Sequence, residues 1–258
     1  MRTLLKIEGL AYSYGSETLI TDLSFEISKG DLLWVLGPNG AGKSTLIKLL
    51  TGYLKPSAGD IWLEGRDLRL EPLSELAKNL AYVPSEIHLP YEFSVLETVL
   101  LGRTPHAGWW RAYSSGDREA AALALEETGM SRFSSRRINS LSSGERQLVF
   151  IAQALAQNPK LLFLDEPTSH LDVRYSAEIL ALLKKLTAEK RLGVCLVSHD
   201  ISLAALAASR LLILKKGGGS MFGAPADLLK SSILAGVYGI KEESARLFLG
   251  SAAAKAGV

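Results

Sequence analysis

The sequence predicts an α/β fold in which a largely parallel sheet is joined to a smaller antiparallel β portion and interrupted by a helical subdomain. Short apolar runs, each as long as a buried strand, alternate with segments of helical periodicity. This alternation is typical of a parallel sheet covered by helices on both faces. The expected buried strands are residues 32–36, 161–164, 193–198 and 211–214, and the expected helices are 43–50, 144–156 and 177–190.

A different pattern predicts the antiparallel portion and the helical subdomain. Apolar and polar residues alternate, as in half-exposed strands, over residues 4–10, 23–27 and 59–63. Between about residues 86 and 140 the sequence gives helical rather than strand patterns, at 95–103 and 117–129.

We therefore expect a single domain over residues 1–258. Its α/β core is formed by residues 1–85 and 141–250, and residues 86–140 form a helical subdomain inserted into that core. The glycines at 217–219 predict a turn, and the small residues from 251 onward predict a frayed tail.

Composition and charge limit the possible functions. The chain has 258 residues, of which 47% are hydrophobic, and a net charge of only +2, so it gives no electrostatic basis for a nucleic-acid partner. The single cysteine, Cys195, excludes an intrachain disulfide and lies in an apolar run, which predicts a buried thiol in a reducing compartment. Charges near the N-terminus argue against a signal peptide, and no segment reaches a membrane-spanning length, so we expect any membrane role to be peripheral.

The clearest chemical signal is residues 37–45, which match the pattern G-x-x-x-x-G-K-[ST]. A glycine-rich turn without function is the alternative, but the expected strand before this loop and the helix after it favour a phosphate-binding loop. The glycines let successive backbone N–H groups point at phosphate oxygens, and the following helix adds its dipole. We expect Lys43 to reach the β- and γ-phosphates and the Ser44 hydroxyl to ligate Mg²⁺. The predicted nucleotide-binding residues are Gly37, Pro38, Asn39, Gly40, Ala41, Gly42, Lys43, Ser44 and Thr45.

A second signal is the apolar run 161–164, which ends in Asp165 and Glu166. Two acids at a strand end are on their own most often a solvated turn. Beside a phosphate-binding loop they predict a P-loop NTPase site, because the carboxyl ends of parallel strands line the ligand crevice. Asp165 is then expected to hold Mg²⁺ through water, and Glu166 to orient and deprotonate the attacking water.

Residues 141–147 resemble the signature sequence of ABC ATPases. As a general feature this stretch could be only a capped helix start, but it stands shortly before the second carboxylate motif, as in that family. Other landmarks resemble the family in order: Tyr14 the aromatic A-loop residue that stacks on adenine, Ser169 and Asp172 the D-loop, and His199 the switch histidine. The signature residues are Leu141, Ser142, Ser143, Gly144 and Glu145.

The resemblance implies an ATP- and Mg²⁺-dependent ATPase that drives a separate permease. It implies a head-to-tail homodimer in which the signature of one subunit covers the ATP held by the other. It further implies catalytic roles for Lys43, Glu166 and His199, transmembrane permease subunits as partners, indirect coupling to a substrate-binding protein, and a place on the cytoplasmic face of the inner membrane.

The chain departs from the family pattern at Ser85, where the family carries the Q-loop glutamine. A serine side chain is too short for the glutamine's direct contact with Mg²⁺, although a water could bridge the gap. We expect weakened hydrolysis or coupling and intact ATP binding. Ser143 and Glu145 also differ from the usual signature, and neither change removes a predicted phosphate donor.

Residues 93–106, 117–120 and 126–130, together with 169–172 and 237–240, are similar to ATPases that power import of iron-siderophore complexes, haem or cobalamin. Trp109 and Trp110 are either permease anchors or ordinary packing residues. The alternatives are a soluble ABC ATPase that is not tied to transport, and a nucleotide-gated scaffold whose hydrolysis is impaired by Ser85. The sequence lacks the long insert or second cassette typical of the first alternative, and Glu166 and His199 argue against the second.

Overall fold

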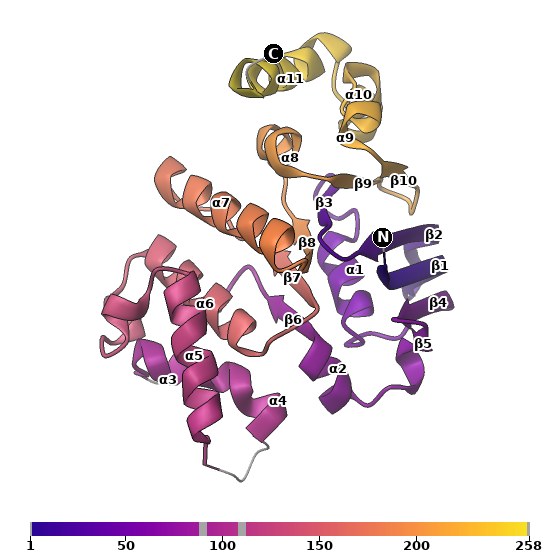
Figure 1. The fold of residues 1–258 in the computed structure, drawn as a ribbon. Coiled ribbons are helices and arrows are strands. Elements are labelled where there is room, and N and C mark those ends of the chain that lie inside the picture. The colour runs from indigo at the N-terminus through magenta and orange to yellow at the C-terminus, as the bar shows by residue number, and fades with distance from the viewer. Residues whose placement is uncertain (1, 88–91, 108–111, 257–258) are drawn as a thin grey trace.

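A computed structural model describes residues 2–87, 92–107 and 112–256, and within these residues the chain forms two sheets with helices around them (Figure 1). Trp109 and Trp110 lie outside the described residues. Among the helices that are described, none is both long and apolar enough to cross a bilayer.

The larger sheet has six strands in the order β10-β9-β3-β8-β7-β6. Its strands pair in parallel except for β9 and β10, which are antiparallel, so the predicted parallel sheet is confirmed. Every residue of β3, β7 and β8 is buried, as the continuous apolar runs require. The strands are β3 (Leu32–Leu36), β6 (Leu80–Val83), β7 (Leu161–Asp165), β8 (Gly193–Val197), β9 (Arg210–Leu214) and β10 (Ser220–Gly223).

The smaller sheet is antiparallel, with the order β2-β1-β4-β5, and confirms the predicted antiparallel portion. Two of its strands are longer than the sequence pattern indicated, because their outer ends continue beyond the buried stretches that gave the alternation. The strands are β1 (Thr3–Tyr14), β2 (Glu17–Ser28), β4 (Ala58–Leu63) and β5 (Arg66–Asp67).

Helix α1 (Lys43–Leu50) lies in the hydrophobic cluster between the two sheets. Helices α6 (Ser143–Ala156), α7 (Val173–Glu189) and α8 (Ile201–Ala207) contribute to a second cluster on the other face of the parallel sheet. Alternate residues of β3 supply the two clusters, since Leu33 and Val35 belong to the first and Trp34 and Leu36 to the second. Each functional loop at the strand ends is thereby held by a packed layer on both sides.

Short helices fill the stretch between β6 and α6. They are α3 (Val95–Leu100), α4 (Thr104–Ala107) and α5 (Ser115–Glu127), joined by 3₁₀ turns at Leu101–Arg103, Ser131–Phe133 and Ile138–Ser140. Arg103 Nε donates to Asp117 Oδ1 over 2.9 Å and ties α5 to the turn after α3. Two further short elements, the 3₁₀ turn Leu68–Leu70 and α2 (Leu73–Asn79), lead from the antiparallel sheet into β6.

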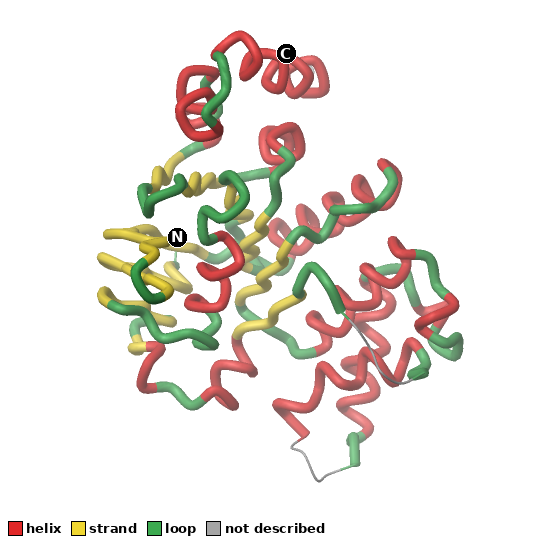
Figure 2. Tube along the Cα trace, turned by 180° about the vertical axis from the view of Figure 1, so that it is seen from behind, coloured by secondary structure: helices red, strands yellow, loops and turns green. Residues whose placement is uncertain are grey.

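The C-terminal part differs from the sequence-based expectation. The residues after β10 form α9 (Pro225–Leu228), α10 (Ser231–Tyr238) and α11 (Glu242–Ala256), so the tail predicted to fray from residue 251 is helical. Helix α11 packs against α8 and α10, which explains its order. These helices and the α3–α5 helices lie at opposite ends of the molecule in both views (Figures 1 and 2).

Candidate active site

The phosphate-binding loop joins β3 to α1, as predicted. Gly42 caps α1 with a left-handed backbone, φ 90°, and uses no side chain for the cap. A Cβ atom at Gly37 would lie 2.5 Å from the carbonyl oxygen of Leu214 in β9, so only glycine fits where the loop begins. Lys43 Nζ donates to the carbonyl oxygens of Gly37, over 2.9 Å, and Pro38, over 3.2 Å. The loop therefore encloses its own lysine in this structure.

A cleft of about 480 Å³ lies against this loop and brings the two predicted motifs together. Asn39, Gly40, Gly42, Lys43, Ser44 and Thr45 line it with Asp165 and Glu166. Burial lowers the pKa of Lys43, while the charges of Glu166 and Asp165 act in the opposite direction. The two carboxylates are therefore close enough to stabilise the ammonium group.

Asp165 ends β7 and is only 5% exposed. Burial raises the pKa of Asp165, while a hydrogen bond from the Ser44 hydroxyl and the charge of Lys43 oppose the rise. A carboxylate and a hydroxyl that already meet at the edge of a phosphate-binding cleft supply the hard oxygen ligands that Mg²⁺ prefers. The side chains present thus fit a Mg²⁺ site.

Tyr82 in β6 is a residue of the site that the sequence analysis missed. Burial, the Asp165 charge and a hydrogen bond with Asp165 raise the pKa of Tyr82 to about 12. The hydroxyl is therefore a donor that steadies the Asp165 carboxylate at neutral pH. The signal in the sequence was the short run 80–83, whose strand is set beside β7 only by the fold.

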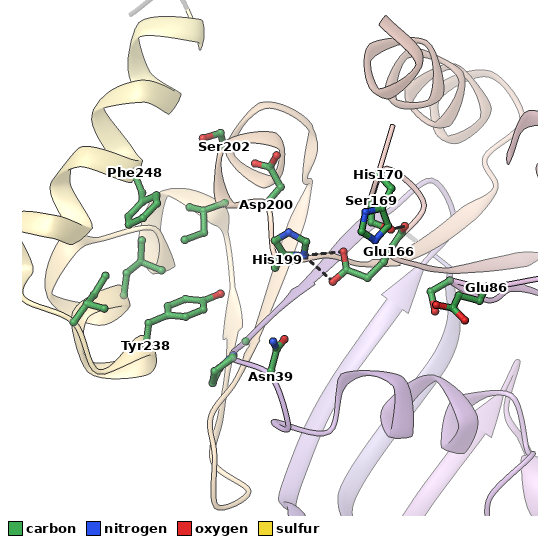
Figure 3. A pocket seen from close by; sticks show the side chains of 16 residues that line it. Asn39, Glu86, Glu166, Ser169, His170, His199, Asp200, Ser202, Tyr238 and Phe248 are labelled. Atoms are coloured by element: carbon green, nitrogen blue, oxygen red, sulfur yellow. Dashed lines mark hydrogen bonds and ion pairs between the residues drawn. The ribbon is translucent and has the colours of Figure 1, made fainter. Parts of the chain in front are cut away.

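Glu166 and His199 follow neighbouring strands, β7 and β8, and their side chains meet (Figure 3). His199 Nδ1 lies 3.1 Å from Oε1 and 3.0 Å from Oε2 of Glu166. A carboxylate only accepts hydrogen bonds, so the proton of this contact is on Nδ1. Glu166 has a φ of 51°, a left-handed conformation that is unusual for a residue with a side chain. Its backbone N–H donates to Val197 O over 2.8 Å, and its carbonyl accepts from Ser169 N and Oγ, which hold this conformation.

Ser85 lies in the loop after β6 and lines the same cleft as Lys43, Asp165 and Glu166. The fold therefore brings the position of the family glutamine to the site, with a shorter side chain. Glu86 lines an adjoining cleft, and in Figure 3 it lies on the far side of Glu166 from His199.

The signature residues begin α6 beside this site. Ser142 caps the helix by a reciprocal pair of hydrogen bonds with Glu145: Ser142 N donates to Glu145 Oε2 over 2.8 Å, and Glu145 N donates to Ser142 Oγ over 3.3 Å. Gly144 packs on the Tyr175 ring so closely that a Cβ atom there would lie 2.2 Å from a ring carbon. Ser143 lines a neighbouring cleft that shares Ser85 and Glu166 with the cleft at the phosphate-binding loop. Among the residues described, the lining of the cleft at the phosphate-binding loop includes none of Leu141, Ser142, Ser143, Gly144 and Glu145.

The D-loop and A-loop residues predicted from the sequence lie at different places around the site. Ser169 lines the cleft that holds Glu166 and His199, and Asp172 caps α7 by accepting from Tyr175 N over 2.9 Å. Tyr14 ends β1 and is 48% exposed, with its ring edge-to-face against Tyr12 at 4.9 Å. It lies outside the cleft at the phosphate-binding loop.

A strand, a glycine loop and a helix, with a buried carboxylate at the end of another strand of the same parallel sheet, define a P-loop nucleotide-binding protein. The ABC transporter family model matches residues 20–169, more than half of the chain. The chain belongs to this family, whose ATP-binding cassettes are ATPases coupled to transport.

The relatives agree with this assignment. The chain is 42% identical over 83% of its length to the uncharacterized ABC transporter ATP-binding protein YvrA of Bacillus subtilis (strain 168), and it spans about half (48%) of that relative's length. It is 37% identical to the iron(3+)-hydroxamate import ATP-binding protein FhuC of the same organism, over 93% of this chain and 89% of FhuC. A solved inward-facing structure of a metal-chelate type ABC transporter superposes with a TM-score of 0.83 at 34% identity, over 92% of this chain and 89% of the other.

Proposed function

We propose that this chain binds and hydrolyses ATP as the motor subunit of an importer. The observation that carries the proposal is the meeting of Lys43, Asp165, Glu166 and His199 at one edge of the parallel sheet. These groups have the charges that hydrolysis of a nucleoside triphosphate needs: a cation for the phosphates, a carboxylate for the metal, and a carboxylate for the water.

Each side chain of the site has its own part in the chemistry. Lys43 leaves the carbonyls of its own loop and binds phosphate, Glu166 orients the attacking water and takes its proton, and His199 holds Glu166 in place. Mg²⁺, which Ser44 and Asp165 would hold, would neutralise charge on the β- and γ-phosphates when bound. Because Nδ1 of His199 donates to Glu166, Nε2 is the ring nitrogen left to face a phosphate, and a hydrogen bond to a phosphate oxygen needs a proton on Nε2 as well.

We assign the signature residues to the ATP of a second copy. Ser142 and the backbone N–H groups at the start of α6 are phosphate-binding groups, but the cleft at the phosphate-binding loop of the same chain does not include them. A head-to-tail homodimer supplies each site with the signature of the other subunit. In this proposal residues 1–85 and 141–250 form the ATPase core, and residues 86–140 contact the permease.

The cargo is proposed from the relatives. FhuC, named as an iron(3+)-hydroxamate import protein, and the metal-chelate type transporter favour an iron-siderophore complex, with haem or cobalamin as the related possibilities. We place the chain on the cytoplasmic face of the inner membrane, bound to permease subunits and coupled through them to a substrate-binding protein.

Ser85 favours one alternative, a nucleotide-gated scaffold with impaired hydrolysis. Its side chain lines the cleft where the family places a glutamine. An importer motor would hydrolyse ATP at a rate that the permease and its loaded binding protein increase, whereas a scaffold would bind ATP without turnover in any combination.

The test is steady-state ATP hydrolysis by the wild type and by Glu166→Gln, each alone and co-expressed with a siderophore permease. The substitution keeps the size of the side chain and removes the base, so we expect hydrolysis to fall roughly 10² to 10⁴-fold while ATP binding persists. Tyr53→Phe, at a side chain that is 79% exposed, is the matched control for ATP binding and hydrolysis. Equal, low rates in the wild type and Glu166→Gln would refute the motor and favour the scaffold.

A further inference from the structure

A second cleft extends beyond the groups assigned so far. It has a volume of about 850 Å³ and joins Gly37, Pro38 and Asn39 of the phosphate-binding loop to the C-terminal helices. Its floor carries Glu166 and His199, and its outer wall carries Leu234 and Tyr238 of α10 and Phe248 of α11 (Figure 3). The C-terminal helices therefore form one side of a cleft that reaches the phosphate-binding loop.

Tyr238 is the polar group of this wall. It is the last residue of α10, and the helix ends at Gly239 in a left-handed conformation, φ 65°. The N–H of Ile240 donates back to Ala235 O over 3.1 Å, which fixes the helix end and the direction of the Tyr238 ring. In Figure 3 the hydroxyl of Tyr238 points to the part of the cleft where Asn39 and His199 lie.

The Tyr238 hydroxyl is buried and, within the part of the chain that is described, has no hydrogen-bond partner. Burial raises the pKa of Tyr238, the backbone of Gly37 opposes the rise, and the charge of Glu166 adds to it. The backbone of Gly37 is thus a neighbour of the Tyr238 hydroxyl. Burying a hydroxyl without a hydrogen-bond partner costs free energy, which a partner gained in another state of the loop would offset.

Movement of Lys43 would give the Tyr238 hydroxyl such a partner. Its ammonium group now donates to the carbonyls of Gly37 and Pro38. When Lys43 turns to a phosphate, the Gly37 carbonyl loses its donor, whereas the Pro38 carbonyl still accepts from Ala41 N over 3.1 Å. The only polar group on the α10 wall among the described lining residues is the Tyr238 hydroxyl. A phenol hydroxyl can rotate to donate to a carbonyl, so a single hydrogen bond would give a partner to both the Tyr238 hydroxyl and the Gly37 carbonyl.

We propose that Tyr238 is a positioning residue of the nucleotide site, whose hydroxyl donates to the backbone of residues 37–39 once Lys43 has left that turn for a phosphate. The hydroxyl then stabilises the nucleotide-bound loop and contributes little to the nucleotide-free one. This inference rests on the proposed binding of ATP by the loop.

The test compares Tyr238→Phe, which removes only the hydroxyl, with Tyr238→Ala, which also removes the ring. For Tyr238→Phe we expect ATP and ADP to bind about three- to tenfold more weakly, with KM raised and kcat nearly unchanged. The nucleotide-free melting temperature should stay the same or rise, because an unpaired buried hydroxyl has been removed. A merely structural role would instead lower that temperature. Tyr53→Phe is the matched control, since Tyr53 is 79% exposed and should bind nucleotide as the wild type does.

Either of two results would overturn the inference while leaving ATP binding by the loop intact. One is wild-type affinity in both Tyr238 variants, and the other is weak binding in Tyr238→Ala alone, which would assign the effect to ring packing. A wild-type chain that binds neither ATP nor ADP would overturn this inference together with the proposed function.

Discussion

The phosphate-binding loop, residues 37–45, and the loop after β7, residues 166–170, line one cleft, and their backbones turn in different ways. Both need left-handed residues to turn sharply at a strand end. The first places glycines there, with φ of 80° at Gly40 and 90° at Gly42. The second places side chains there, with φ of 51° at Glu166 and 61° at His170.

The difference follows from what each loop must present. The first offers backbone N–H groups to a phosphate, for which a side chain is useless and glycine costs least. The second must present a carboxylate, so it accepts a backbone strain of about 1–2 kcal/mol at a residue that has a Cβ atom. The strand end just before this loop also carries the buried carboxylate of Asp165. Replacing a glycine of the first loop by alanine should therefore lower the free energy of unfolding. Replacing Glu166 of the second loop by glycine should raise it, relative to a variant that keeps a Cβ atom there.

The largest effect is expected for Gly37→Ala. The new Cβ atom would meet Leu214 O at 2.5 Å, and a backbone carbonyl within a sheet cannot move away. We expect the free energy of unfolding to fall about 1–3 kcal/mol further than in Gly40→Ala, with nucleotide binding lost. Gly40→Ala is the matched control, because its Cβ would meet no atom within 4 Å and only its φ of 80° is unfavourable. Urea unfolding measures both, and equal losses would mean that the contact with Leu214 is not what demands glycine.

An intermediate effect of the opposite sign is expected for Glu166→Gly. Relative to Glu166→Gln, which has also lost the base but keeps a Cβ atom at φ 51°, the glycine variant should be more stable by about 1 kcal/mol. Hydrolysis should be equally low in both. Urea unfolding without nucleotide measures the difference. A glycine variant less stable than the glutamine variant would show that the left-handed backbone at Glu166 carries no strain.

The sequence indicated both loops because each sits at a boundary that has a local pattern. Residues 32–36 and 161–164 are continuous apolar runs that stop at a glycine loop and at two acids, and they became β3 and β7. Ser142 and Glu145 gave the capped start of α6 for the same reason. These are short-range signals, and short-range physics produces them.

The contributors that the sequence analysis missed depend on long-range packing. Tyr82 acts on Asp165 because β6 pairs with β7, some 80 residues later in the chain. Helix α10 was not predicted, since its residues are apolar around most of its surface and give no clear helical face. Gly239 after that run was the local signal of a helix end. Ser85 was found by resemblance, and only the fold brings it to the cleft beside Lys43.

The smallest effect, and the one that tests charge rather than backbone, is expected for Asp165→Asn. Burial raises the pKa of Asp165 in the folded chain, so the folded state favours the protonated carboxyl more than the unfolded state does. Wild-type stability without nucleotide should therefore fall as the pH rises from the ordinary aspartate value of 3.8 through the raised pKa. The asparagine variant does not titrate there, and at pH 7 it should be more stable than the wild type by less than about 1 kcal/mol. Urea unfolding from pH 3.5 to 7 measures this difference in stability, which should disappear at the acidic end.

With MgATP present the order of stability should reverse, because the amide is a poorer Mg²⁺ ligand than the carboxylate. If the difference in free energy of unfolding between the two proteins were independent of pH, packing and not the buried charge would make Asp165 unfavourable. The backbone strain at Glu166 would then be matched by no electrostatic cost at Asp165.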